Sequence, residues 1–258
     1  MRSLIIVPAD EKRLAEALAS GADALIVDLA SAPAEKRAAA RAVAARLLKQ
    51  ARARGGGPAL AVGVNALDSG ETDPDLDAVL GCAPDAILLP GSLGAASIQQ
   101  LSAKLAVREA DFALPDGATR IIAVADTARA LLNMASYRGS SGRLAGLAWS
   151  AASLRADIGA ETDRDPSSGA YTGAFRLARD LTLLAAAAAD VAAIDAAFAD
   201  VADGKGLRAE AAAARRDGFS AKLAIDPAQP RIINEAFRAH PGSGRRTIGF
   251  HRTENTNP

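Results

Sequence analysis

The sequence has few of the residues on which common catalytic sites depend. It holds one cysteine, Cys82, and two histidines, His240 and His251, in 258 residues. A single cysteine forms no internal disulfide, which favours a reducing, cytoplasmic setting. Both histidines stand near the end of the chain. We therefore expect no Ser-His-Asp triad, no Cys-His pair and no Cys/His zinc site.

An excess of charge of either sign is also absent. The 30 basic and 30 acidic side chains give a formal net charge of zero, so we expect no nucleic-acid partner and no anionic membrane surface. The most apolar stretch, residues 181–189, lies between Asp180 and Asp190 and is too short to span a bilayer. No phosphate-binding motif of the G-x-x-x-x-G-K-[ST] or G-x-G-x-x-G kind follows a strand, so no nucleotide-phosphate loop is predicted.

What the chain does have is a series of short apolar runs separated by helix-like stretches. Such runs are typical of parallel strands that are covered on both faces, and a chain of about 250 residues suits an eight-fold strand–helix barrel. We predict a TIM (β/α)₈ barrel with a closed parallel sheet, as one domain over residues 1–240, followed by a flexible tail over 241–258. The runs span residues 4–7, 24–27, 60–64, 87–89, 121–125, 144–149, 191–194 and 223–225.

Polar residues follow several of these runs. The strands of a barrel end at one common mouth, where the chemistry of this fold takes place. Carboxylate, hydroxyl and amide oxygens in such a place suit Mg²⁺, or hydrogen bonding to a substrate that carries a carboxylate. The candidate site residues at the run ends are Asp28, Asn65, Asp126, Ser150 and Asp226.

The second half of the chain departs from this even spacing. Residues 150–173 form the longest stretch that we expect to be irregular, and a loop of this length is more often functional than idle. Its centre, residues 163–169, is a candidate lid or a plain exposed loop. The following helix, 174–189, is apolar on most sides and is expected to be buried, in part against another subunit. Shorter helices are expected over 127–137 and 228–238.

An ordered set of motifs resembles the citrate lyase β-subunit-like proteins of the HpcH/HpaI aldolase group, over residues 2 to about 238. The resemblance implies a TIM barrel, a trimer or hexamer, and Mg²⁺-assisted cleavage or formation of a carbon–carbon bond in 3-hydroxy acids or their CoA thioesters. The motifs are Arg2-Ser3-x-x-x-Val7-Pro8, Gly21-Ala22-Asp23-x-x-x-x-Asp28-Leu29, Val64-Asn65, Pro84-Asp85-x-x-x-Leu89-Pro90, Thr127-Ala128-x-x-x-x-Asn133, Leu154-x-x-Asp157-Ile158-Gly159, Ala193-Ile194-Asp195 and Gly218-Phe219-x-x-Lys222-x-x-Ile225-Asp226-Pro227-x-Gln229.

Several positions depart from the pattern of that family. The arginine that grips the keto-acid carboxylate is replaced by Gly63, which offers no guanidinium. The metal-binding glutamate after the fifth strand is replaced by Asp126, and the second metal ligand, an aspartate, by Ser153. Both acidic residues that follow the leucine of the second-strand motif are replaced, by Ala30 and Ser31, and the histidine of a late Ile-His-Pro motif is replaced by Asp226. One carboxylate and one hydroxyl supply less negative charge than the family pair, so we expect weaker metal binding.

Three functional hypotheses follow from the resemblance and these departures. The first is a diverged carbon–carbon lyase acting on a small carboxylate or CoA thioester, with Asp126 and Ser153 as metal ligands. In this hypothesis Asp28 and Asn65 are catalytic, and Arg2, Asn65 and Ser150 bind substrate. The second is a catalytically impaired barrel that binds a metabolite or serves as a structural subunit. The third is metal-free acid–base chemistry that uses Asp28 and Asp226.

Each acidic candidate also has an ordinary structural interpretation. Asp126 is either a weak metal ligand or the N-cap of the helix that follows. Asp28 is either a supporting acid at the mouth or a turn residue. Asp226 is either a new acid at the mouth or part of an Asp-Pro turn, and we favour the turn.

The neutral and basic candidates have such interpretations too. Ser150 and Ser153 bind substrate or cap the segment after the sixth strand. Asn65 donates to substrate or satisfies a loop. Arg2 holds an anionic substrate or forms a surface ion pair.

Overall fold

The strands form the closed barrel that the apolar runs predict. A computed structural model describes residues 1–238 and 248. Eight strands pair in parallel in sequence order, and the last closes on the first. The strands are β1 (Ser3–Pro8), β2 (Ala24–Asp28), β3 (Ala59–Gly63), β4 (Ala86–Leu89), β5 (Arg120–Ala125), β6 (Leu144–Trp149), β7 (Ala192–Asp195) and β8 (Ala221–Ala224).

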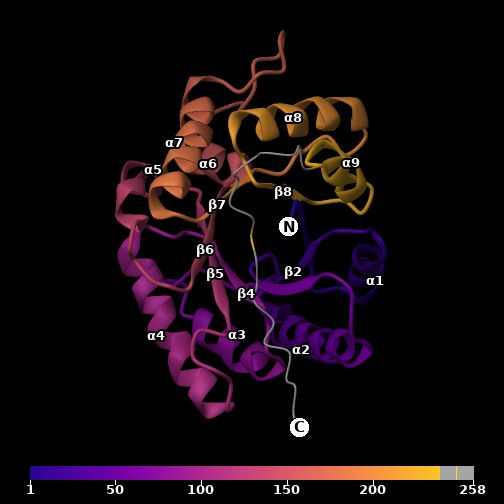
Figure 1. Ribbon diagram of the computed structural model, residues 1–258, viewed down its shortest axis with the longest axis vertical. Coiled ribbons are helices and arrows are strands. Elements are labelled where there is room, and N and C mark those ends of the chain that lie inside the picture. Colours follow the sequence, from indigo (N-terminus) through magenta and orange to yellow (C-terminus); the bar gives the residue numbers. More distant parts are fainter. Residues whose placement is uncertain (239–247, 249–258) are drawn as a thin grey trace.

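Helices surround the barrel, as Figure 1 shows. Alternating residues of each strand face the barrel interior or the helices, so that in β2 Ile26 packs inside while Leu25 and Val27 pack outside. The helices are α1 (Glu11–Ala19), α2 (Arg37–Arg54), α3 (Thr72–Val79), α4 (Ala95–Asp111), α5 (Ala128–Leu132), α6 (Ala151–Ile158), α7 (Gly173–Ala189), α8 (Gly204–Asp217) and α9 (Gln229–Ala236), with short 3₁₀ turns at Ala34–Lys36, Leu80–Cys82 and Met134–Tyr137.

Two local predictions were wrong. The stretch 150–173 is not irregular throughout, because α6 occupies its first third. Ser150 caps the start of α6, and Gly159 ends it in the left-handed region. The helix expected over 127–137 is broken at Asn133, whose side-chain amide donates to the Leu93 carbonyl at 2.6 Å.

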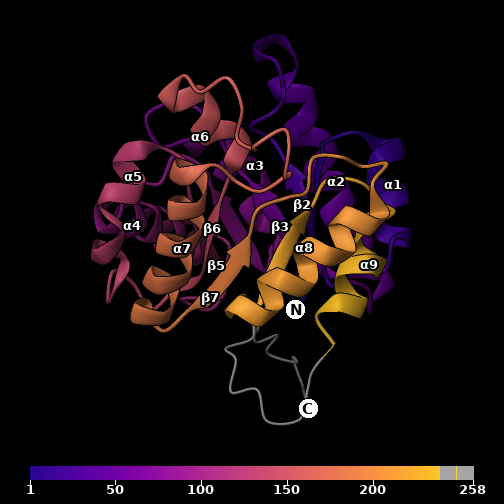
Figure 2. The same cartoon turned by 90° about the horizontal axis from the view of Figure 1, so that it is seen from above.

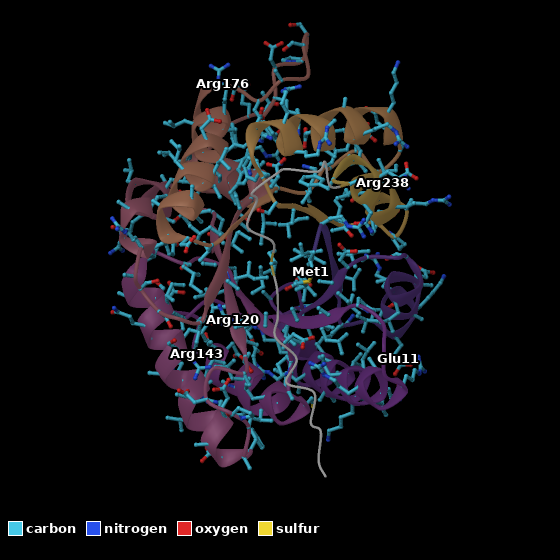
Figure 3. The ribbon with its side chains drawn as sticks, viewed as in Figure 1. Met1, Glu11, Arg120, Arg143, Arg176 and Arg238 are labelled. Carbon is cyan, nitrogen blue, oxygen red and sulfur yellow. The ribbon has the colours of Figure 1, made fainter. Side chains whose placement is uncertain are left out.

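The two ends of the barrel differ. The N-terminus and α6 lie at opposite ends in the view of Figure 2, and Met1 is drawn in the middle of the helix ring in Figure 3. Ile248 is 3% exposed and packs in the interior cluster, and its carbonyl accepts a hydrogen bond from the Met1 ammonium at 3.2 Å. The predicted flexible tail otherwise lies outside the described residues.

Among the described residues, no helix combines the length and hydropathy needed to cross a bilayer. This includes α7, the helix that contains the most apolar stretch of the sequence.

Candidate active site

A cavity of about 370 Å³ opens at the carboxyl ends of the strands. Two of its three acidic residues, Asp28 and Asp126, follow Ile26 and Val124 on the inward face of their strands. Most of the remaining wall is apolar, which raises the cost of leaving a charge there without a partner. Besides these carboxylates, the polar lining consists of Ser150, Ser153, Asp163, Arg164 and Tyr171.

Asp126 is 8% exposed, and one of its oxygens accepts a hydrogen bond from the Gly91 N–H at 3.1 Å. Burial raises the pKa of this carboxyl, and the nearby charge of Asp157 acts in the same direction. Asp126 is not the N-cap of α5, because Thr127 occupies that position and accepts from the Ala130 N–H. Its oxygens therefore remain available to a ligand or cation in the cavity.

Asp28 forms the predicted turn and also lies in the wall of the cavity. Its carboxylate accepts from the Ala30 N–H at 3.0 Å in a turn after β2, and it also lines the cavity. Burial raises its pKa, against the lowering effect of hydrogen bonds from Ser31 and Ala30. Gly63 lies beside it, and a Cβ at position 63 would come within 3.2 Å of Asp28 Oδ1. The missing side chain thus leaves room for the Asp28 carboxylate.

The serines at the start of α6 both line the cavity and cap the helix. Ser150 Oγ accepts from the Ser153 N–H at 3.2 Å, and the two hydroxyl oxygens are 3.0 Å apart. The capping interpretation is confirmed, while a ligand role for either hydroxyl stays a prediction.

The other candidates lie elsewhere. Both Asn65 nitrogens, from the backbone and the side chain, donate to Asp75 at 2.8 Å, and Asn65 is not part of the cavity wall. Asp226 accepts from the Ala228 N–H at 2.8 Å, which confirms the turn. Arg2 precedes β1 at the amino end of the barrel and forms a salt bridge with Asp23. The mouth therefore brings together Asp28, Asp126, Ser150 and Ser153, but neither Asn65 nor Arg2.

Sequence reasoning missed the contribution of Arg164 and Tyr171. Both belong to the loop after α6, where Arg164 pairs with Tyr171 in an isolated antiparallel bridge. The Arg164 guanidinium lies 3.9 Å from the centre of the Tyr171 ring, within the range of a cation–π interaction. The position of the loop after the sixth strand was a signal for its role, but the sequence did not indicate which of its side chains reach the cavity.

A network of buried charges lies behind this loop. Lys222 is fully buried, and its ammonium donates to Asp195, Glu210 and the Ala196 carbonyl at 3.1, 2.8 and 2.6 Å. Although burial alone would raise the pKa of Asp195, the charges of Lys222 and Arg179 lower it overall. The second Glu210 oxygen accepts from Arg164 at 2.7 Å, so the loop is tied to the barrel through α8.

Residues 2–227 match the HpcH/HpaI aldolase/citrate lyase family. The chain belongs to this family. It is 30% identical to the citrate lyase subunit beta-like protein of Mycobacterium tuberculosis over 97% of this chain and 85% of that protein. It is also 30% identical to a (3S)-malyl-CoA thioesterase of Cereibacter sphaeroides over 98% of this chain and 84% of the relative.

Solved structures of HpcH/HpaI-related proteins share the fold. RipC from Yersinia pestis superposes with a TM-score of 0.73 at 33% identity, covering 93% of this chain and 96% of RipC. CitE from Mycobacterium tuberculosis, solved with magnesium, acetoacetate and coenzyme A, gives a TM-score of 0.76 at 29% identity, covering 93% of this chain and 82% of CitE. That neighbour therefore binds magnesium and a small carboxylate, and the relatives support a lyase or a protein that acts on CoA thioesters.

Proposed function

We propose that this chain is a carbon–carbon lyase that acts on a small hydroxy acid or its CoA thioester with the help of Mg²⁺. The observation that carries the proposal is the place of Asp126. This buried carboxylate faces the mouth cavity and accepts from the Gly91 N–H and its own backbone N–H. It has no ion-pair partner among residues 1–238 and 248. A carboxylate in such a setting gains from a bound cation.

The donor chemistry around the cavity fits a hard cation. Asp126 would supply a carboxylate oxygen and Ser153 a hydroxyl oxygen, and Mg²⁺ commonly keeps several waters. In the described part of the chain no group of three His, Cys, Asp or Glu side chains could complete an all-protein site, which favours weak binding. When bound, the ion would polarise a carbonyl of the substrate.

Asp28 is the residue that we propose for proton transfer. It lines the same cavity as Asp126, and burial raises its pKa, which brings a carboxyl closer to the pH at which it can take and return protons. Asn65 and Arg2 are left out of this site because Asn65 is held by Asp75 and Arg2 lies at the opposite end of the barrel.

The first experiment measures Mg²⁺ binding by isothermal titration calorimetry in the unmodified protein, Asp126→Asn and Ser153→Asp. We expect Asp126→Asn to abolish binding, and Ser153→Asp to tighten it about tenfold, because one more negative charge faces the ion. Release of CoA products from malyl-CoA, citramalyl-CoA and citryl-CoA, followed by chromatography, tests turnover. Absence of both Mg²⁺ binding and turnover in the unmodified protein would reject the proposal.

A metabolite-binding barrel without catalysis is the second candidate. The bond between the Ser150 and Ser153 hydroxyls favours it, because it engages the second ligand position. This candidate predicts no turnover in the unmodified protein, and recovery of Mg²⁺ binding in the triple variant Ser153→Asp, Asp126→Glu and Gly63→Arg. Tight Mg²⁺ binding by the unmodified protein would exclude it.

We also propose a cytoplasmic homo-oligomer, a trimer or hexamer. Leu177 and Leu184 on α7 are 58% and 66% exposed, which supports a covered apolar face. Cys82 is free and buried, in keeping with a reducing compartment. Light scattering coupled to gel filtration gives the subunit number, and a monomer would contradict the assembly.

A further inference from the structure

Arg164 is the single cation in the wall of the mouth cavity, counted over the described residues. It also lines a neighbouring cavity of about 830 Å³ under α8, together with Tyr171. The family's carboxylate-binding arginine is missing at position 63, where Asp28 occupies the space beside the backbone. Any anionic group that enters the mouth therefore has Arg164 as its nearest source of opposite charge in the wall.

The structure holds this arginine in place before a ligand arrives. Its terminal nitrogens donate to the Gly169 carbonyl at 3.0 Å and to Glu210 at 2.7 Å. The strands of the loop are joined by backbone bonds from Thr172 N–H to the Asp163 carbonyl and from Asp165 N–H to the Ala170 carbonyl, at 3.0 and 2.9 Å. A preformed position reduces the entropy that binding must remove.

Arg164 has donor capacity beyond its ion pair. It stands at the end of a series of alternating charges, paired with Glu210, and Asp163 is a further negative charge near it. Its Nε and the Tyr171 hydroxyl have no hydrogen-bond partner within residues 1–238 and 248, so both can donate to a ligand. In order, the charged residues of this series are Asp217, Arg179, Asp195, Lys222, Glu210 and Arg164.

The rest of the wall restricts what else the ligand carries. Ile6, Leu88 and Val124 give the cavity an aliphatic lining. The two other charged groups on the barrel's inward face, Asp28 and Asp126, are carboxylates that no described cation pairs with. A second or third carboxylate on the ligand would meet apolar surface or like charge, and both are unfavourable.

We propose that Arg164 and Tyr171 bind the carboxylate of a monocarboxylate ligand whose remaining part is aliphatic and packs against Ile6, Leu88 and Val124. The proposal names the substrate class of the candidate active site. It rests on the proposed lyase function only in that both use the same cavity. Arg164 thus takes the carboxylate-binding task that Gly63 cannot perform.

The test is equilibrium binding without metal or CoA, followed by the fluorescence of Trp149, the single tryptophan of the chain, which lines the cavity. The probes are 2-oxobutyrate and oxaloacetate, which share four carbons and differ by a second carboxylate, and citrate. We expect 2-oxobutyrate to bind at least about tenfold more tightly than the other two. Equal or stronger binding of oxaloacetate or citrate would overturn the proposal, as would absence of binding by all three.

Variants assign the effect to the arginine. Arg164→Gln is expected to weaken 2-oxobutyrate binding at least about tenfold, Arg164→Lys to recover part of it, and Tyr171→Phe to weaken it a few-fold. Arg176→Gln is the matched control, since Arg176 is exposed on α7 at the outer edge of Figure 3 and should bind as the unmodified protein does. Circular dichroism checks that each variant is folded.

The outcomes separate this proposal from the lyase proposal. Binding of 2-oxobutyrate that depends on Arg164, without turnover of any thioester, would reject the lyase and keep the ligand class. If a thioester is turned over and Arg164→Gln changes neither KM nor kcat, the lyase proposal is supported and the role of Arg164 is rejected.

Discussion

At the scale of single residues, the mouth carboxylates are held in a state that costs stability. Burial raises the pKa of Asp28, so the folded protein favours its protonated form more than the unfolded chain does. The protonated carboxyl therefore contributes its full stability below pH 3.8. This contribution is lost as the pH rises from 3.8 through the folded pKa, and the ionised carboxylate is then buried at a cost. A residue used for chemistry can carry such a cost.

Replacement of Asp28 by a neutral isostere should therefore stabilise the protein. We expect Asp28→Asn to raise the free energy of unfolding at pH 7.5 by about 1 kcal/mol, a typical effect of one substitution, because the amide oxygen can still accept from the Ala30 N–H. Urea unfolding at pH 7.5 and at pH 3.5 measures this gain, which should shrink at the lower pH. A destabilised variant at pH 7.5 would contradict the assignment.

Residue-level reasoning from the sequence was most successful where the strand period decided the direction of a side chain. Asp28 and Asp126 each stand two positions after an inward-facing residue. Because side chains alternate between the two faces of a strand, both carboxylates point to the mouth. It failed for Asn65, which follows the end of β3 and turns to Asp75 on α3. No sequence pattern gives such a contact, because it depends on how a helix packs on the loop.

At the scale of elements, the ends of the helices are tied to the barrel by buried ions. Glu109, near the end of α4, is 1% exposed and accepts from Arg143, the Thr119 N–H and the Gly117 N–H. Burial alone would raise its pKa, but these partners lower it overall. The carboxylate thus joins α4 to the segments that enter β5 and β6.

Loss of this carboxylate should be costly. We expect Glu109→Gln to destabilise the protein by about 3 kcal/mol, because it leaves the buried Arg143 without its main partner, whereas Glu16→Gln on the exposed face of α1 should have little effect. Since the folded pKa is lowered, the contribution is present above pH 4.5 and is lost as the pH falls through the folded value. Urea unfolding between pH 3 and pH 7 checks both statements, and equal effects of the two substitutions would contradict them.

The loop beside the cavity offers a second test at this scale. Asp165 accepts from the N–H and hydroxyl groups of Ser167 and Ser168, and these bonds lower its pKa to about 2. Carboxyl-detected NMR should show Asp165 titrating near that value, and Ser167→Ala should move the value toward 3.8 because one donor is lost. A titration of Asp165 near 3.8 in the unmodified protein would show that the loop does not hold this form in solution.

Elements themselves were largely predictable, and the exceptions have local causes. The alternation of apolar runs and helical stretches predicted all eight strands within a few residues. α6 was missed because it is short and follows directly from the strand, so that its N-cap, Ser150, is also the residue that ends the sixth apolar run. The break at Asn133 arises from a bond to the distant Leu93 carbonyl, which local propensity does not encode.

At the scale of the whole molecule, the barrel interior is completed by a residue from the end of the chain. Ile248 belongs to the interior cluster with residues of all eight strands, and Met1 bonds to its carbonyl. Met1 and Ile248 therefore meet at the amino end of the barrel. No sequence pattern predicts this contact, since Ile248 stands in a stretch rich in glycine and arginine.

Removal of this side chain should weaken the whole fold. We expect Ile248→Ala to destabilise the protein by about 2 kcal/mol, at the lower end for a buried isoleucine. Ile158→Ala is the control, because Ile158 is 40% exposed at the end of α6. Thermal unfolding should show a melting temperature lower by about 4–8 °C for the first variant and nearly unchanged for the second, and a shift of equal size in both would contradict a structural role of Ile248.

The packed interior also closes the site on its inner side. The side chains of the interior cluster, among them Leu4 and Ile248, fill the barrel below the cavity. In the described part of the molecule, ligands therefore enter and leave on the carboxyl-end side. An enzyme that splits one compound into two fragments there must release them in turn. The fragment nearer the exit leaves first, and the fragment lodged deeper has to wait for it.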